Sequence, residues 1–145
     1  LLNGENVSVE IRTPPASMAA SDVSAVPEVR AFLFDLQRDI ASRNNCIMDG
    51  RDIGTVVLPD AQVKIFLTAS AEERAQRRYK ELQAKGSTVS FQSVLDELIE
   101  RDYNDSHREI APLKPAEDSV LLDTTGVSLE EQVEKIISII KEKVQ

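Results

Sequence analysis

Residues 63–73 read Val-Lys-Ile-Phe-Leu-Thr-Ala-Ser-Ala-Glu-Glu, and they place a strand pattern directly before the start of a helix. Residues 63–67 favour a strand because β-branched and aromatic side chains pack well on a pleated surface. Ser70 and Glu73 then form a capping box, in which each side chain bonds the backbone N–H of the other residue. We expect the helix to stop at Gly86.

The same order of signals returns near the C-terminus. Residues 120–123, Val-Leu-Leu-Asp, predict another core strand, and Ser128 with Glu131 predicts the capped start of a terminal helix. Between the two strands, Ser90 caps a further helix with an apolar stripe. The residues expected to face inward from the terminal helix are Leu129, Val133, Ile136, Ile137 and Ile140. Strands that alternate with helices predict an α/β fold with a parallel sheet.

The first residues suggest a hairpin. Asn3-Gly4 is typical of a two-residue turn, and Val7, Val9 and Ile11 alternate with polar residues as in a half-buried strand, which the prolines at 14 and 15 would end. Almost no partner strand precedes Asn3. We therefore expect the chain to be a fragment that is truncated inside a hairpin.

A helix and a short strand are predicted next. Asp22 is a candidate N-cap, although Pro27 also suits a first helical turn, and Asn44-Asn45 would end the helix. Cys46-Ile47-Met48 then reads as a short apolar strand. Within it, we expect Cys46 to be a buried structural thiol, and a single cysteine is typical of a reducing compartment.

Composition restricts the class of protein. A chain of 145 residues with 41% hydrophobic residues is most simply one globular domain, with an aliphatic core because only 4% of residues are aromatic. A net charge of −8 argues against a nucleic-acid-binding surface. The sequence contains no stretch apolar enough to cross a membrane and no signal peptide, so we expect a cytoplasmic location without membrane partners.

The loop at residues 49–55 is the first candidate site. It surrounds Arg51 and Asp52 with two glycines directly after a predicted strand, where α/β proteins bind their ligands. Arg51 could donate two hydrogen bonds to a phosphate or a carbonyl, and Asp52 could accept one from an amino or hydroxyl group. Asp49 could hold a metal ion through water. The alternative is an Arg–Asp pair that only fixes the loop.

Two further groups of arginines suggest an anionic ligand. Arg101, Asp105 and Arg108 are spaced to share one helix face, which would be either a ligand site or a solvated row of ion pairs. A second group lies near the start of its helix, where like charges repel one another and cations are disfavoured. This second group either binds an anion or belongs to an ordinary surface, on which nearby glutamates offset the repulsion between the arginines. Its members are Arg74, Arg77 and Arg78.

Together these segments resemble the bacterial cytidylate (CMP) kinases. The similarity covers essentially the whole chain, in order. It is carried by residues 9–13, 49–57, 59–67, 70–78, 100–108 and 111–113 and by the strand that ends at Asp123. The resemblance implies a P-loop nucleoside-monophosphate-kinase-like parallel sheet flanked by helices. It also implies transfer of the γ-phosphate of ATP to CMP or dCMP, giving CDP or dCDP, with Mg²⁺.

The resemblance also implies roles for particular residues. Contacts to the acceptor nucleotide would come from Ser21, Arg30, Arg51, Asp52, Arg101, Asp105 and Arg108. Arg51, Arg108 and Arg78 would act on the transferring group, and Arg74, Arg77 and Arg78 would belong to a lid at about residues 72–88 that closes over ATP. Residues 1–20 would be the remainder of the acceptor-binding insert, and residues 21–145 the kinase core.

One element of the family pattern is missing from this sequence. The Gly-rich loop with Lys and Ser/Thr, which cradles the donor phosphates, does not occur in it. We therefore expect an N-terminally truncated fold that by itself is inactive, requires no cofactor and can associate through exposed sheet edges, from a monomeric parent enzyme. The alternatives are a kinase for another small acceptor (UMP, AMP or shikimate) and a non-catalytic nucleotide-binding remnant.

Overall fold

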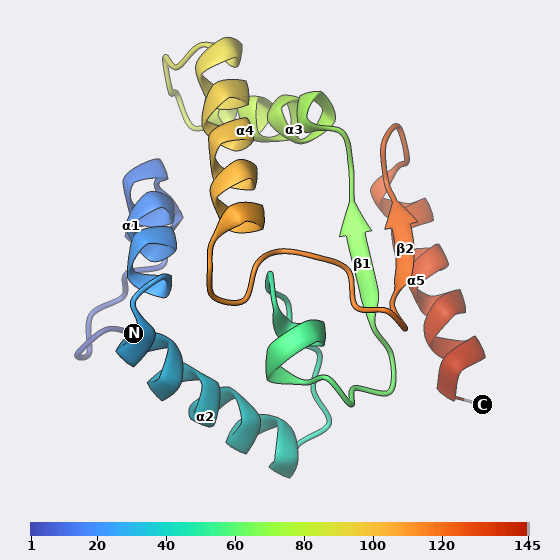
Figure 1. Ribbon diagram of the computed structural model, residues 1–145. Helices are drawn as coiled ribbons and strands as arrows, with labels where there is room; N and C mark the ends of the chain where they lie inside the picture. The colour runs from blue at the N-terminus through green and yellow to red at the C-terminus, as the bar shows by residue number, and fades with distance from the viewer. Residues whose placement is uncertain (145) are drawn as a thin grey trace. The chain divides into compact units, whose positions relative to one another are not determined.

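The computed structural model describes residues 1–144, apart from the side chain of Pro14; Gln145, the last residue of the expected kinase core, lies outside them. The chain divides into two compact units, Leu1–Ile47 and Met48–Gln145 (Figure 1).

The first unit begins with the predicted turn, but the strand that was expected to follow it is absent. Leu2 and Glu5 form an antiparallel bridge across Asn3 and Gly4, which have φ angles of 49° and 90°, so the turn prediction is confirmed. The strand prediction for residues 7–11 is wrong. The short 3-10 helix η1 (Glu10–Arg12) forms there instead, because the backbone finds hydrogen-bond partners within its own turn.

Two helices make up the rest of the first unit, α1 (Pro14–Ser24) and α2 (Pro27–Arg43). The prolines at 14 and 15 therefore begin a helix and do not end a strand, which suits the first turn because proline lacks the N–H that would be unbonded there. Asp22 lies inside α1 and caps nothing, whereas the alternative start at Pro27 is confirmed. α2 ends before Asn44, as predicted.

The segment that leads out of the first unit is not a strand. Residues 46–48 have no regular structure, and Cys46 is exposed, so the predictions of a strand and of a buried thiol are both wrong. A strand needs a neighbour for its hydrogen bonds, and none of the described segments pairs with this one.

The second unit contains a parallel sheet of two strands, β1 (Ile65–Thr68) and β2 (Val120–Asp123). Their register runs from Ile65 opposite Val120 to Thr68 opposite Asp123, which confirms the parallel arrangement. The first strand begins two residues later than the predicted 63–67. Lys64 Nζ pairs with Asp118 at 2.6 Å, which joins the starting ends of the two strands.

The terminal helix α5 (Leu129–Val144) has the complete capping box that the sequence predicts. Ser128 Oγ accepts from Glu131 N at 3.3 Å, and Glu131 Oε2 accepts from Ser128 N at 3.0 Å. Ile136 and Ile140 are half-buried, but the prediction is wrong for three other residues of the apolar stripe, which are exposed. They are Leu129, Val133 and Ile137.

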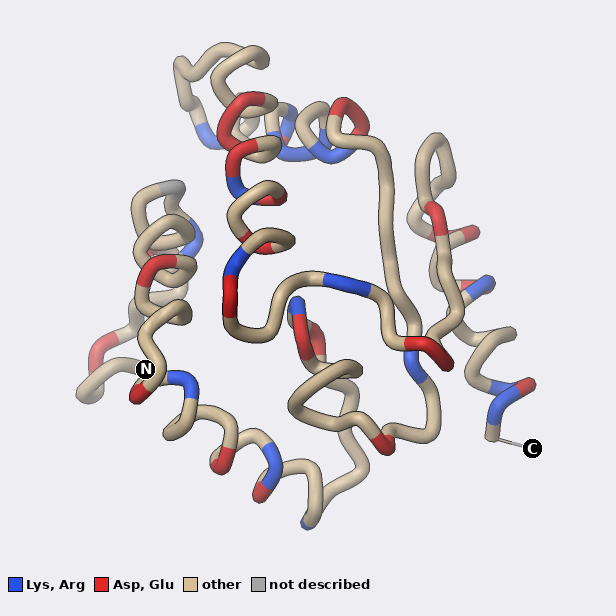
Figure 2. The backbone as a smooth tube through the Cα atoms, in the orientation of Figure 1, with Lys and Arg blue, Asp and Glu red and all other residues tan. Residues whose placement is uncertain are grey.

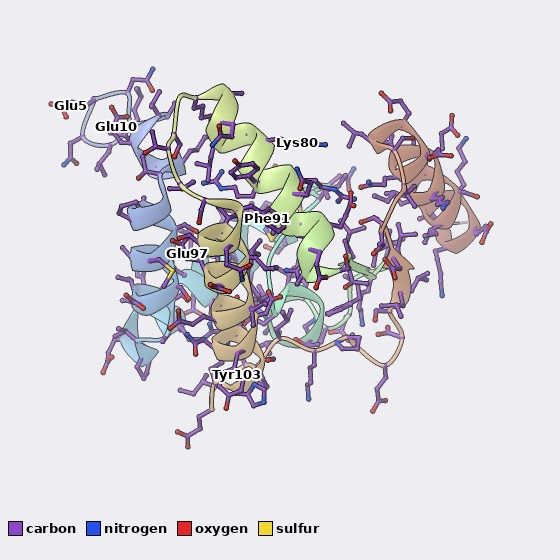
Figure 3. All side chains as sticks on the ribbon, turned by 90° about the horizontal axis from the view of Figure 1, so that it is seen from above. Glu5, Glu10, Lys80, Phe91, Glu97 and Tyr103 are labelled. Carbon is purple, nitrogen blue, oxygen red and sulfur yellow. The ribbon has the colours of Figure 1, made fainter. Side chains whose placement is uncertain are left out.

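Helices α3 (Ala71–Ala84) and α4 (Phe91–His107) follow each other in the chain and pack together, with α3 running across the direction of α4 (Figure 1). Their shared core contains Ala75, Leu82 and Val94. The rings of Tyr79 and Phe91 meet edge-on, with 5.9 Å between their centroids; Phe91 is labelled in Figure 3. The caps and the stop were predicted from sequence. Ser70 and Ser90 accept from backbone N–H groups three residues on, and Gly86 follows α3 with φ of 79°. The Ser70 box is only half formed, because Ser70 N donates to Thr125 Oγ1.

None of the helices formed by residues 1–144 combines the length and the apolar character that crossing a membrane requires.

Candidate nucleotide-binding site

The loop at residues 49–58 is held by a single wide helical turn. In η2 (Ile53–Val57), Leu58 N donates to Ile53 O at 2.7 Å, five residues back, which is the hydrogen bond of a π-turn and is frequent at functional sites. Val57 is buried and anchors this turn. Neither Gly50 nor Gly54 has a positive φ. Gly50 is instead required by close approach, since a Cβ there would lie 2.8 Å from the side chain of Ile53.

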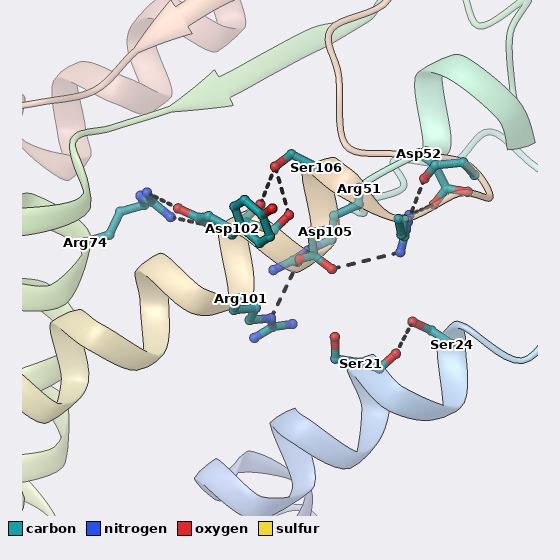
Figure 4. A network of polar contacts seen from close by, with 12 residues as sticks. Ser21, Ser24, Arg51, Asp52, Arg74, Arg101, Asp102, Asp105 and Ser106 are labelled. Atoms are coloured by element: carbon teal, nitrogen blue, oxygen red, sulfur yellow. Dashed lines mark hydrogen bonds and ion pairs between the residues drawn. The ribbon is translucent and has the colours of Figure 1, made fainter.

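Asp105 is the centre of the polar contacts in the second unit. It is only 4% exposed, and its Oδ2 accepts from Arg51 Nε at 2.7 Å across 54 positions of sequence (Figure 4). Arg101 Nε lies 3.8 Å from the same oxygen, and Arg108 Nη1 lies 3.9 Å from Oδ1. A carboxylate can be buried in this way only because cations surround it.

Arg108 contacts the carboxylate of Asp105 from outside α4. α4 ends at His107, and Arg108 has extended backbone angles, so the prediction that all three residues share one helix face is wrong for Arg108. The chain folds back here, with Leu113 N donating to Asp105 O at 2.7 Å and Arg108 Nε to Ala111 O at 2.7 Å. Arg108 Nη2 consequently lies 3.6 Å from Asp52 Oδ1, which links α4 to the loop at 49–58.

We call Arg51, Asp52, Arg101, Asp105 and Arg108 the Asp105 cluster. Arg101 lies among acidic residues in the second half of α4 (Figure 2). The pKa of Arg101 is lowered, first by burial of its guanidinium and second by the charge of Arg51, against opposing effects of Asp105 and Asp102. Three guanidinium groups share two carboxylates, so the cluster has a net positive charge and favours an anionic ligand.

The arginines of α3 bond to other groups of the protein. Arg77 donates to Glu73 Oε1 at 3.1 Å and to Thr124 O at 2.8 Å, and Arg78 donates to Glu81 Oε2 at 3.2 Å. Arg74 makes three hydrogen bonds, two of them to Asp102 (Figure 4). Their assignment to the phosphates of ATP stays a prediction.

The remaining predicted site residues lie apart from the Asp105 cluster in sequence. Ser21 is on α1, where its carbonyl accepts from Ser24 Oγ at 2.8 Å, and Arg30 on α2 donates to Ser24 O at 3.3 Å, so both belong to the first unit. Asp49 is exposed, and among the described residues no three His, Cys, Asp or Glu side chains are grouped so that they could hold a metal ion.

Sequence reasoning missed two residues that organise the second unit. Asp102 binds Arg74 from 28 positions away, and the buried Thr124 donates its hydroxyl to Thr68 O at 2.9 Å while its carbonyl receives Arg77. No spacing rule could have found either pair, because each joins elements that only the fold brings together.

Comparisons with known proteins show the family of the chain. The family model for cytidylate kinase matches residues 1–142. The chain belongs to the cytidylate kinase family. It is 56% identical to a cytidylate kinase of Carboxydothermus hydrogenoformans over 99% of its residues, which are 64% of that protein. Identity is 54% to the cytidylate kinases of Pasteurella multocida and Fervidobacterium nodosum, over 98% of the chain and 63% and 65% of those proteins.

Family membership confirms the resemblance and the fold class inferred from sequence. The P-loop kinase fold of cytidylate kinases is an α/β fold, in agreement with the parallel pair β1 and β2 and the helices that follow each strand. The chain spans less than two thirds of the length of these relatives.

Proposed function

We propose that the protein to which this chain belongs transfers the γ-phosphoryl group of ATP to CMP or dCMP. The observation that carries the proposal is the Asp105 cluster, a net positive group of arginines and aspartates in a chain of the cytidylate kinase family. A nucleoside monophosphate combines an anion with hydrogen-bonding base and sugar groups, and this set of side chains can bind both kinds of group.

The acceptor nucleotide would be shared among seven residues. Arg30, Arg51 and Arg108 would bind its phosphate, since a guanidinium forks onto two phosphate oxygens. Asp105 would accept from the sugar hydroxyls. The cytosine edge would be contacted by Asp52, Ser21 and Arg101.

The transfer itself requires positioning and neutralisation of charge, with no covalent intermediate on the protein. Arg51 donates a hydrogen bond to Asp105, and Arg108 forms ion pairs with Asp52 and Asp105; the incoming phosphate would take the place of these carboxylates. Arg78 would add positive charge over the transferring group.

The donor side would involve the lid at about residues 72–88. Arg74, Arg77 and Arg78 on α3 would close over the phosphates of ATP and exclude water. Mg²⁺, when bound, supplies further neutralisation of phosphate charge, and such ions are usually held by one or two carboxylates with substrate phosphates and water. Asp49 fits that pattern as an exposed carboxylate that could hold the ion through water.

The proposal is tested with the full-length protein that the gene encodes. Release of ADP from ATP is measured with CMP, dCMP, UMP and AMP in turn, and binding of each monophosphate is measured by calorimetry. We expect CMP and dCMP to be preferred, and a preference for UMP or AMP would contradict the proposal. Arg108→Ala should abolish binding of CMP. Arg43→Ala, which removes an exposed arginine paired with Asp39 within α2, is the matched control.

A further inference from the structure

Arg74 connects three elements of the second unit. Its Nη1 and Nη2 donate to the two oxygens of Asp102 on α4, at 3.0 and 2.6 Å, and its Nε donates to Ala69 O, just beyond β1, at 3.0 Å (Figure 4). Both side chains of the ion pair are about one-third exposed. The pKa of Arg74 is raised, first by the hydrogen bonds to Asp102.

The pair lies beyond the apolar core that α4 shares with α3. The apolar core between α3 and α4 joins both halves of α3, at Ala75 and Leu82, to the first half of α4, at Val94. The second half of α4, which carries Arg101 and Asp105, relies on polar contacts. Asp102 directly follows Arg101 and precedes Asp105 by three residues, less than one helical turn.

We propose that Asp102 is a positioning residue for the acceptor site. Its bidentate pair with Arg74 holds the second half of α4 against the carboxyl end of β1, and it thereby orients Arg101 and Asp105 for the acceptor nucleotide. This inference rests on the proposed function and changes one part of it: Arg74 would support the acceptor site, and the contacts of the lid with ATP would fall to Arg77 and Arg78.

The two assignments of Arg74 make different kinetic predictions. Three of the five N–H groups of its guanidinium already donate to protein oxygens, so a phosphate of ATP would have to share Arg74 with Asp102 and Ala69 or displace them. If Arg74 positions α4, loss of the pair weakens the binding of CMP. If Arg74 instead binds ATP, loss of Asp102 leaves the binding of CMP unchanged, and it can make Arg74 more available to the phosphates of ATP.

The experiment compares Asp102→Asn, Arg74→Lys and the double variant in the full-length protein. We expect each single variant to raise the KM for CMP about fivefold, as loss of one charge-assisted fork would, and to change the KM for ATP by less than twofold. The KM for CMP of the double variant should not exceed that of the more impaired single variant, because both substitutions remove the same contact. Asp96→Asn is the matched control, since Asp96 is an α4 carboxylate that bonds only Gln92 of its own helix among the contacts described for it.

The possible outcomes separate this inference from the proposed function. A wild-type protein that neither binds nor phosphorylates CMP refutes the proposed function. A wild-type protein that binds CMP, with a KM for CMP unchanged in both single variants, refutes only the positioning role. A rise confined to the KM for ATP in Arg74→Lys makes Arg74 a donor-phosphate ligand. If the pair had only a structural role, its loss would lower the midpoint of thermal unfolding and weaken the binding of CMP and ATP together.

Discussion

The two groups of arginines in the second unit differ in their surroundings. In the Asp105 cluster, the carboxylate of Asp105 is 4% exposed and contacts three guanidinium groups. They belong to Arg101 of α4, to Arg108 directly after α4 and to Arg51, which lies 54 positions away in the sequence. On α3, Arg77 and Arg78 pair with glutamates of their own helix, four and three residues away. Burial and the distance in sequence between partners decide how much each contact stabilises the fold.

The largest effect is expected at the centre of the cluster. Asp105→Ala leaves partly buried guanidinium groups without their shared counter-charge, and we expect the free energy of unfolding to fall by about 3 kcal/mol. Urea unfolding of the variant measures this loss, and Asp96→Ala on the exposed face of α4 serves as the control. A loss below about 1 kcal/mol would mean that the cluster is no more than a surface ion pair.

The next effect concerns ligand binding. Arg51→Lys keeps the charge but loses the Nε that donates to Asp105, and we expect the affinity for CMP to fall about tenfold because Lys cannot reproduce the fork. Calorimetry of the full-length protein with CMP measures the affinity. Equal affinities in the variant and the wild type would favour the view that Arg51 only fixes its loop.

A smaller effect distinguishes the two arginines on α3. Arg77→Gln removes the bond to the carbonyl of Thr124, so we expect a loss of about 1 kcal/mol in the free energy of unfolding. Arg78→Gln removes a pair with Glu81 on the same helix and should cost less than about 0.5 kcal/mol. If the two losses are equal, the contact with Thr124 contributes nothing beyond a surface pair.

The smallest effect is a pH dependence at the start of α5. Hydrogen bonds from the side chain and the backbone of Ser128 lower the pKa of Glu131 in the folded state. Its contribution to stability is therefore complete above the ordinary pKa of a glutamate and is lost as the pH falls through the lowered value. We expect the difference in unfolding free energy between the wild type and Glu131→Gln to shrink as the pH falls from 7 to 3. A constant difference would show that the carboxylate charge is irrelevant to the cap.

Local signals in the sequence predicted the helices and the sheet of the second unit well. Ser70, Ser90 and Ser128 precede helices because each satisfies a backbone N–H within three residues, an interaction that needs no distant partner. Two other predicted strands, both near the N-terminal side of the chain, did not form, for the opposite reason. Residues 7–11 and 46–48 have strand-like sequences, but a strand forms only when another segment supplies its hydrogen bonds.

For the candidate site, the sequence by itself determined which residue types are present and in what order. The loop at 49–55, the Arg101–Asp105 pair and the resemblance to cytidylate kinases were all visible without coordinates. Tertiary structure alone decided that Arg51 reaches Asp105, that Arg108 leaves the helix to meet Asp52, and that Asp102 holds Arg74. The physical reason is that an ion pair between distant segments depends on how the chain packs, whereas a cap or a turn depends only on its neighbours.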